Sequence, residues 1–290
     1  MADVEKLVLV GVGLLGGSIA KAALARGVAS DVVGVGRNAQ KLDRAVRAGT
    51  LTAATIDLAE ACAGAELVVV CTPVDTIAEQ VQNVAAACDR PTLITDAGST
   101  KGNIVAALPG ELPGGCRFVG SHPLAGSEKT GAANATEDLF VGRTVVVTPT
   151  EAVQSADVER LSAFWSALGA TVRIMSPDEH DEALAATSHA PHLIAAALAL
   201  ATREKDLPLT ASGWLDTTRI AAADAELWRP IFDANRANVL KALARFEKTM
   251  ALLRRALEDE SANELTKLLA EAKQVRDAAE EIRNANALGS

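Results

Sequence analysis

The feature that most constrains the fold is a glycine-rich turn near the start of the chain. It follows the apolar run Leu7–Val10 and leads into a helical stretch that begins near Gly17. In such a turn Gly11 permits the tight bend, Gly13 lets the backbone approach a pyrophosphate, and Gly16 lets the helix pack closely on the strand. This context predicts a dinucleotide site, with a tight turn that binds nothing as the alternative. The predicted cofactor-binding residues of the turn are Gly11, Gly13, Leu14, Leu15 and Gly16.

Residues 1–175 alternate short apolar runs with helical stretches. The runs are continuously apolar for the most part, as expected of parallel strands covered on both faces. The rhythm predicts an α/β fold with a Rossmann-type, doubly wound, mostly parallel sheet as the dinucleotide-binding domain. The predicted strands are Lys6–Val10, Val32–Val35, Leu67–Cys71, Thr92–Thr95, Phe118–Val119, Thr144–Thr148 and Thr171–Met175.

Helical periodicity replaces the strand pattern after Ser176-Pro177, which predicts an all-helical domain over residues 176–290. Two apolar stripes joined by a polar turn at residues 259–261 predict an antiparallel helical hairpin. The stripes either pack against the same chain or form a homodimer interface, and we favour the interface. Their members are Val239, Leu243, Phe246, Met250, Leu253 and Leu257, then Leu265, Leu268, Ala272, Val275, Ala279 and Ile282.

The net charge of −9 argues against nucleic acid and against an anionic membrane as partners, because both attract basic surfaces. The four cysteines lie far apart in the sequence, which indicates a reducing compartment rather than a disulfide scaffold. The most apolar stretch, Leu193–Ala201, is shorter than a membrane span. We therefore expect a cytoplasmic protein that acts on a small molecule.

The second predicted strand lacks the acidic residue that usually binds the ribose of NAD. Gly36 stands at its tip and Arg37 follows. The glycine leaves room and the arginine supplies charge for a 2′-phosphate, so we predict that NADP is preferred over NAD. A solvated Arg37, or one stacked on the adenine, is the alternative.

Polar residues follow three of the predicted strands, at the edge where open parallel sheets bind ligands. Thr72 can face the cofactor, although an ordinary strand exit would look the same. Ser99 could act in the site or cap the next helix. His122, just beyond a strand and followed by Pro123, suits proton transfer near neutral pH.

The helical half carries the other three histidines and a candidate anion-binding arginine. His189 and His192 share a helix face, with His180 roughly opposite, and the intervening Pro191 should kink that helix. No Cys or carboxylate motif supplies the further ligands that zinc needs, so we predict no metal. Arg219, in a loop rich in Gly and Thr, could bind a substrate carboxylate or lie on the surface.

In combination, these segments resemble the prephenate/arogenate dehydrogenase family of tyrosine biosynthesis. The resemblance implies a Rossmann domain and a helical dimerisation domain with the active site between them, and oxidative decarboxylation of a cyclohexadienol. The segments that carry it, beside the glycine-rich turn, are Asp96–Gly102, Ser121–Gly126, Ser188–His192 and Asp216–Ala221.

By this resemblance His122 accepts the proton of the substrate hydroxyl as hydride leaves for the nicotinamide, and Ser99 orients that hydroxyl or His122. Arg219 would bind a substrate carboxylate, with Ser127 and Glu128 ordering or gating the pocket. Its lining would include His180, His189, His192 and Trp228.

One departure and two alternatives stay open. Leu215 stands where the family often has a basic residue, which leaves the choice between prephenate and arogenate undecided. A two-domain dehydrogenase of the β-hydroxyacid or imine-reducing kind is one alternative, although no matching lysine motif lies around residues 180–220. A non-catalytic protein that senses NADP is the other.

Overall fold

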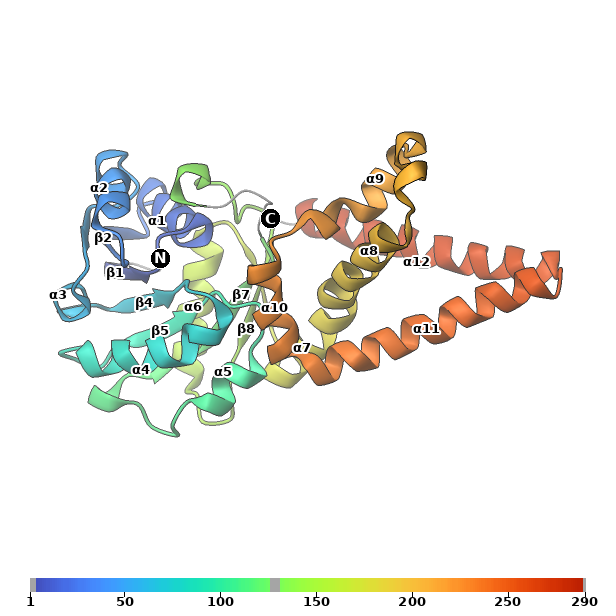
Figure 1. Ribbon diagram of the computed structural model, residues 1–290. Helices are drawn as coiled ribbons and strands as arrows, with labels where there is room; N and C mark the ends of the chain where they lie inside the picture. Colours follow the sequence, from blue (N-terminus) through green and yellow to red (C-terminus); the bar gives the residue numbers. More distant parts are fainter. Residues whose placement is uncertain (1–3, 126–130, 289–290) are drawn as a thin grey trace. The chain divides into compact units, whose positions relative to one another are not determined.

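The computed structural model describes residues 4–125 and 131–288 and forms two compact units (Figure 1). The first unit comprises Met1–Asp181 and Ala223–Ala234, and the second comprises Glu182–Ala222 and Asn235–Ser290. Helix α10, Ala225–Ala234, therefore packs with the first unit although its sequence lies in the helical half. The predicted domain boundary after residue 175 stays a prediction.

The first unit contains a six-stranded parallel sheet with the order β3-β2-β1-β4-β5-β6. The direction in which strands are added reverses between β1 and β4, so the carboxyl ends of these two strands mark the usual ligand crevice. This sheet confirms the predicted Rossmann-type fold. The strands are β1 Val4–Val10, β2 Ala29–Val35, β3 Ala53–Thr55, β4 Leu67–Val70, β5 Leu93–Asp96 and β6 Arg117–Phe118.

Helices cover both faces of this sheet. Successive side chains of a strand point to opposite faces, and those on both faces are apolar and buried under helices. Leu7 of β1 shares a core with Ile19 of α1, whereas Val8 shares the opposite core with Val81 of α4. All four side chains are fully buried. The α-helices of this region are α1 Leu14–Ala25, α2 Ala39–Arg47, α3 Leu58–Cys62, α4 Ile77–Ala87, α5 Gly102–Ala107 and α6 Ser155–Ala167, and the 3-10 turns are η1 Val74–Thr76, η2 Pro113–Gly115 and η3 Ala132–Asn134.

A second, three-stranded sheet holds β7 Gly120–Pro123, β8 Thr144–Thr148 and β9 Thr171–Ile174. Strand β7 is antiparallel to β8, and His122 lies opposite Val146. The expectation that His122 occupies a loop at the edge of the parallel sheet is therefore wrong, since it lies inside a strand. Strand β7 was not predicted because its residues Ser121 and His122 are polar and form no apolar run. An apolar run also does not show which sheet a strand joins.

The second unit is helical, as predicted, and contains α8 Ala190–Ala201, α9 Ser212–Thr218, α11 Arg236–Glu258 and α12 Ala262–Leu288. Shorter elements are the π-helical turn η4 Ala185–His189 and the 3-10 turns η5 Glu204–Leu209 and η6 Arg219–Ala222. Its small core joins η4, α8 and α11 through Ala185, Ala190 and Val239.

Helix α7, Pro177–Leu184, continues through η4 into α8 as one helical run of 25 residues. The stretch Leu193–Ala201 is only its last part, and by length and composition alone the whole run is long and apolar enough to cross a membrane. A core helix of a globular protein meets the same two criteria. Helix length therefore does not argue against a membrane span, as the length of Leu193–Ala201 taken alone did.

The predicted hairpin is present, because α11 and α12 are joined by a short turn over residues 259–261 (Figure 1). Its apolar stripes do not pack against the same chain along most of their length. Met250 is 47% exposed, Val275 is 73% exposed and Ile282 is 61% exposed. The stripes leave a large apolar surface that a monomer does not bury.

Candidate functional site

Glycine is required at two positions of the turn between β1 and α1. Gly11 has φ +98°, a region that side chains disfavour, and a Cβ there would lie 2.9 Å from the carbonyl oxygen of Cys71. A Cβ on Gly16 would lie 2.1 Å from the carbonyl oxygen of Gly11. A Cβ on Gly13 would meet nothing within 4 Å, so the backbone there borders open space.

A cavity of about 430 Å³ opens beside this turn at the carboxyl ends of β1 and β2. Gly11, Gly13, Arg37 and Thr72, four of the residues predicted to bind the cofactor, line it. Lys41 of α2 also lines it, a second cation that the sequence reasoning missed. The lining residues that the structure describes include no Asp or Glu. Leu14 and Leu15 form the first turn of α1, where free N–H groups favour an anion.

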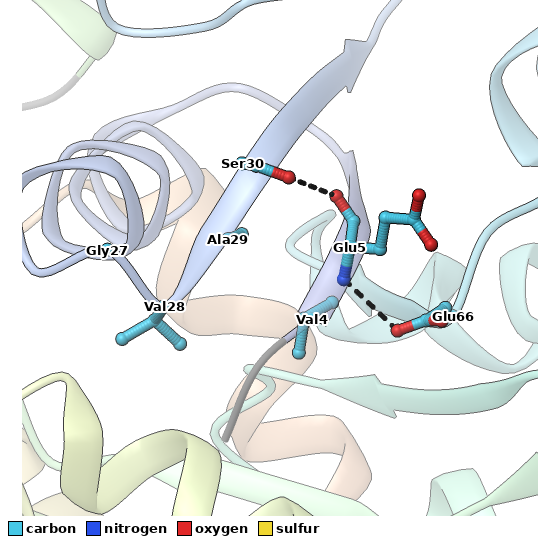
Figure 2. A pocket seen from close by; sticks show the side chains of 7 residues that line it. All are labelled: Val4, Glu5, Gly27, Val28, Ala29, Ser30 and Glu66. Atoms are coloured by element: carbon cyan, nitrogen blue, oxygen red, sulfur yellow. Dashed lines mark hydrogen bonds between the residues drawn. The ribbon is translucent and has the colours of Figure 1, made fainter. Parts of the chain in front are cut away.

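A second cavity of about 460 Å³ lies at the opposite ends of the same strands (Figure 2). It is lined at the amino ends of β1 and β2, away from the glycine-rich turn. Its two carboxylates are Glu5 and Glu66, and Glu66 accepts a hydrogen bond from the Glu5 amide and pairs with Arg90. Because open α/β sheets bind ligands at their carboxyl ends, the cavity beside the turn is the candidate cofactor site.

His122 is hydrogen-bonded to a second histidine inside the first unit. Its Nδ1 lies 2.9 Å from Nε2 of His180, which α7 carries. Nδ1 of His180 lies 2.8 Å from Oδ1 of Asp181. His180 is fully buried, whereas His122 is half-buried. The structure thus places three titratable side chains in a row, with His122 at the more accessible end.

The carboxylate of Asp181 is held in place by the start of α5. The backbone amide of Lys101 donates to Oδ1 at 2.8 Å, and that of Gly102 donates to Oδ2 at 2.8 Å. Burial raises the pKa of Asp181, but the hydrogen bonds from His180, Gly102 and Lys101 outweigh it and lower the pKa overall. Burial lowers the pKa of His180 despite the opposing effect of Asp181, so this ring is neutral near pH 7.

A buried ion pair fixes strand β7 to the end of β5. The ammonium of Lys101 binds the carboxylate of Asp96 and donates to the carbonyl oxygen of Ser121 at 2.8 Å. The hydroxyl of Ser121 donates to the Asp96 carbonyl oxygen at 2.6 Å and accepts from Nε1 of Trp165 at 3.1 Å. His122 is the next residue after Ser121, so this network sets the position of its backbone.

Two other predicted residues, Ser99 and Trp228, also belong to the first unit. Ser99 follows β5 and is half-buried, and no hydrogen bond joins it to His122 within the part of the chain that is described. Trp228 of α10 packs against the core that contains Val74 and Ile77, and it contacts the ring of Phe232. The predicted gating residues Ser127 and Glu128 lie outside the described residues.

The second unit brings together Arg219 and His192. His192 hydrogen-bonds to the backbone of Ile220, and burial, with a smaller effect of the Arg219 charge, lowers its pKa. Arg219 is exposed at the start of η6. The third predicted residue of this unit, His189, is buried, with its Nδ1 3.2 Å from Nδ2 of Asn235.

The helix that was predicted to kink at Pro191 changes its geometry just before that residue. The helix continues through it, and the preceding turn, Ala185–His189, is π-helical. A π-helical turn is wider than an α-helical one, and such turns are frequent at functional sites. His189 closes this turn.

Sequence reasoning missed Asp181 and Lys101 as parts of the site. Asp181 directly follows His180, so an acidic neighbour was visible, but nothing local shows that its carboxylate meets α5 across about eighty residues of chain. Lys101 lies in the segment Asp96–Gly102 that carries the family resemblance, yet a lysine is normally expected at the surface.

Among the described residues, no group of three His, Cys, Asp or Glu side chains could hold a metal ion.

Residues 19–174 match the family model for the prephenate dehydrogenase nucleotide-binding domain, and residues 176–271 match that for the dimerization domain. Prephenate dehydrogenase of Bacillus subtilis is 31% identical over 94% of this chain and 76% of its own length. The crystal structure of prephenate dehydrogenase from A. aeolicus with hydroxyphenyl propionate and NAD+ has a TM-score of 0.86 at 31% identity, covering 95% of this chain and 98% of that one. Arogenate dehydrogenase of Synechocystis has a TM-score of 0.81 at 27% identity, covering 94% and 99%.

Proposed function

This chain belongs to the prephenate dehydrogenase family, whose reaction is the NAD(P)-linked oxidative decarboxylation of a cyclohexadienol in tyrosine biosynthesis, and we propose that it performs this reaction with His122 as general base. The observation that carries the proposal is the hydrogen bond between His122 Nδ1 and His180 Nε2. It orients a half-buried imidazole on a strand that a buried ion pair fixes in place. A fixed histidine suits proton transfer near neutral pH.

His122 Nε2 takes the proton of the substrate hydroxyl on C4. The nicotinamide, when bound, accepts the hydride from C4. Loss of the hydroxyl proton and the hydride turns the alcohol into a ketone conjugated with the ring carbon that bears the carboxylate. The bond to the carboxylate then breaks, its electron pair completes the aromatic ring, and carbon dioxide leaves. Ser99, half-buried after β5, supplies a hydroxyl that can orient the substrate hydroxyl.

The cavity beside the glycine-rich turn fits a dinucleotide. Gly13 leaves open space for a pyrophosphate, and the first turn of α1 offers N–H groups to it. Thr72 lines the same cavity. Arg37 and Lys41 place two cations where the family of folds often has an acidic residue, which supports a preference for NADP over NAD.

Arg219 binds a carboxylate of the substrate in this proposal. It is exposed, and the lowered pKa of His192 keeps its neighbour neutral near pH 7, so the arginine charge is available to an anion. His192 and Trp228 are proposed to line the substrate pocket, and the buried His180 and His189 to support its wall without touching the substrate. Ser127 and Glu128 are proposed to order or gate it. Prephenate and arogenate are both candidates, since they differ only in a keto or amino group on the side chain.

The C-terminal half forms a homodimer interface in this proposal. The match to a dimerization domain and the exposed residues of the two stripes, Met250 on α11 and Val275 and Ile282 on α12, support it. Sedimentation of the wild type should give a dimer, and Val275→Asp should shift it toward the monomer. A monomeric wild type at micromolar concentration would contradict this part of the proposal.

The reaction is tested by incubating the wild-type protein with each pairing of NADP or NAD and prephenate or arogenate. We expect reduced cofactor to form together with one carbon dioxide and one para-hydroxyphenyl product per turnover. Cofactor reduction without carbon dioxide would indicate another dehydrogenase activity. No reduction with any pairing would overturn the proposed function.

A further inference from the structure

The row of Asp181, His180 and His122 has only one consistent pattern of hydrogen atoms. Asp181 is an ionised carboxylate, because two backbone N–H groups already point at its oxygens and its pKa is lowered. An ionised carboxylate only accepts hydrogen bonds. The ring nitrogen that faces it, His180 Nδ1 at 2.8 Å, must therefore carry the hydrogen.

The position of the hydrogen on His180 determines the position of the hydrogen on His122. His180 is neutral near pH 7 and has its hydrogen on Nδ1, so its Nε2 is an acceptor. The nitrogen that faces it, His122 Nδ1 at 2.9 Å, must then be the donor. The lone pair of the His122 ring is thereby on Nε2. The opposite tautomer of either ring would set two donors or two acceptors against each other.

We propose that Asp181 and His180 are positioning residues that fix His122 in the tautomer whose Nε2 is the basic nitrogen. This inference rests on the proposed function, because it assigns a purpose to the partners of the proposed base. The pair also stabilises His122 after protonation, since the imidazolium keeps its Nδ1–H bond to His180 and a carboxylate lies one ring beyond.

The surroundings of His180 are consistent with that purpose. The charged groups that act on it are Asp181 on its own helix, Lys101 before α5 and Asp96 at the end of β5. Lys101 and Asp96 form an ion pair with each other, which leaves Asp181 as the carboxylate bonded to the ring. The backbone bonds from α5 keep that carboxylate from turning away.

The first test reads the tautomer directly from the nitrogen shifts of the histidine rings in full-length protein near pH 8. The His122 signal is identified as the one lost in His122→Asn. We expect the hydrogen of neutral His122 on Nδ1. A His122 ring with its hydrogen on Nε2 would overturn the inference, and this measurement needs no turnover.

The second test compares His180→Leu with His180→Gln. Leucine offers no acceptor to His122 Nδ1, whereas the amide oxygen of glutamine offers one. We expect kcat to fall about ten- to a hundredfold in the leucine variant, with KM changed little, and to recover in part in the glutamine variant. Asp178→Asn changes an exposed carboxylate of the same helix and should leave kcat unchanged.

The third test follows kcat/KM against pH in Asp181→Asn. Losing the carboxylate removes stabilisation from protonated His122, so the pKa of the base falls and the acidic limb of the profile moves to lower pH. Unchanged kcat and pH profiles in both Asp181→Asn and His180→Leu would overturn the inference while leaving His122 as base. A His122→Asn variant of near-normal turnover would instead overturn the proposed function.

Discussion

The glycine-rich turn and the His122 network are two parts of one unit that are encoded in different ways. The turn is six consecutive residues whose geometry is set by their own backbone and by one neighbouring strand end. The network joins β5, the start of α5, β7, α6 and α7, and its members are up to 85 positions apart in the chain, from Asp96 to Asp181. Local steric rules determine the first, and the topology of the whole unit determines the second.

If the network depends on its buried ion pair, then removing one charge should have a large effect on stability. Lys101→Met leaves the Asp96 carboxylate buried without its partner, and the free energy of unfolding should fall by about 3–5 kcal/mol. Lys273→Met, which breaks an exposed pair with Asp277, should cost about 0–1 kcal/mol. Equal losses in the two variants, measured by urea unfolding, would show that the ion pair does not hold β7.

The turn should tolerate no side chain at its closest contact. A Cβ on Gly16 would lie 2.1 Å from the Gly11 carbonyl oxygen, so Gly16→Ala should cost about 1–3 kcal/mol and weaken cofactor binding. Gly110→Ala is the control, because nothing lies within 4 Å of its Cβ position. Titration of NADP and thermal unfolding measure both effects. A Gly16→Ala protein that binds NADP as tightly as the wild type would contradict the role of the turn.

The cavity beside the turn should discriminate between cofactors through Arg37. Replacing it with alanine removes one of two cations in the cavity, and the ratio of kcat/KM for NADP to that for NAD should fall about tenfold, the effect of one charge-assisted hydrogen bond. Arg47→Ala, at the exposed end of α2, should leave the ratio unchanged. A wild type that prefers NAD would show that Arg37 and Lys41 do not select the 2′-phosphate.

The network should also give the fold a modest pH dependence. The pKa of buried His180 is lowered in the folded state, so below the unfolded value of about 6.5 the unfolded chain binds more protons. Stability is therefore lost as the pH falls through that range, and Asp181, whose pKa is also lowered, adds to the loss at more acidic pH. Between pH 8 and 5 the Tm of the wild type should drop more than that of His180→Gln. Parallel curves would mean that His180 is not buried as a neutral ring.

The same contrast explains what the sequence could and could not predict. The glycine-rich turn, most strands of the parallel sheet, the hairpin of α11 and α12 and the cavity position of Thr72 and Arg37 all follow from local patterns. Strand β7 did not, because Ser121 and His122 are polar and its partner is a strand of a second sheet. The return of α10 to the first unit was invisible for a similar reason, since helical periodicity does not show which core a helix joins.

The site residues divide in the same manner. His122 was predicted from its type and its place after a strand, although it lies inside the separate strand β7. Asp181 needs the contact between α7 and the start of α5, and Lys101 needs the burial that only the assembled unit produces. Long-range partners of this kind have no fixed spacing in the chain, so they emerge only from the fold.

His122 is the proposed base of an NAD(P)-linked oxidative decarboxylation, and His122→Asn tests that role most directly. In one preparation, the Kd for NADP should stay within about twofold of the wild type, because the turn and its cavity are untouched. Single-turnover cofactor reduction with the preferred substrate should slow about 10²–10⁴-fold, the usual contribution of a general base. Reduction at close to the wild-type rate, with NADP bound normally, would contradict the claim.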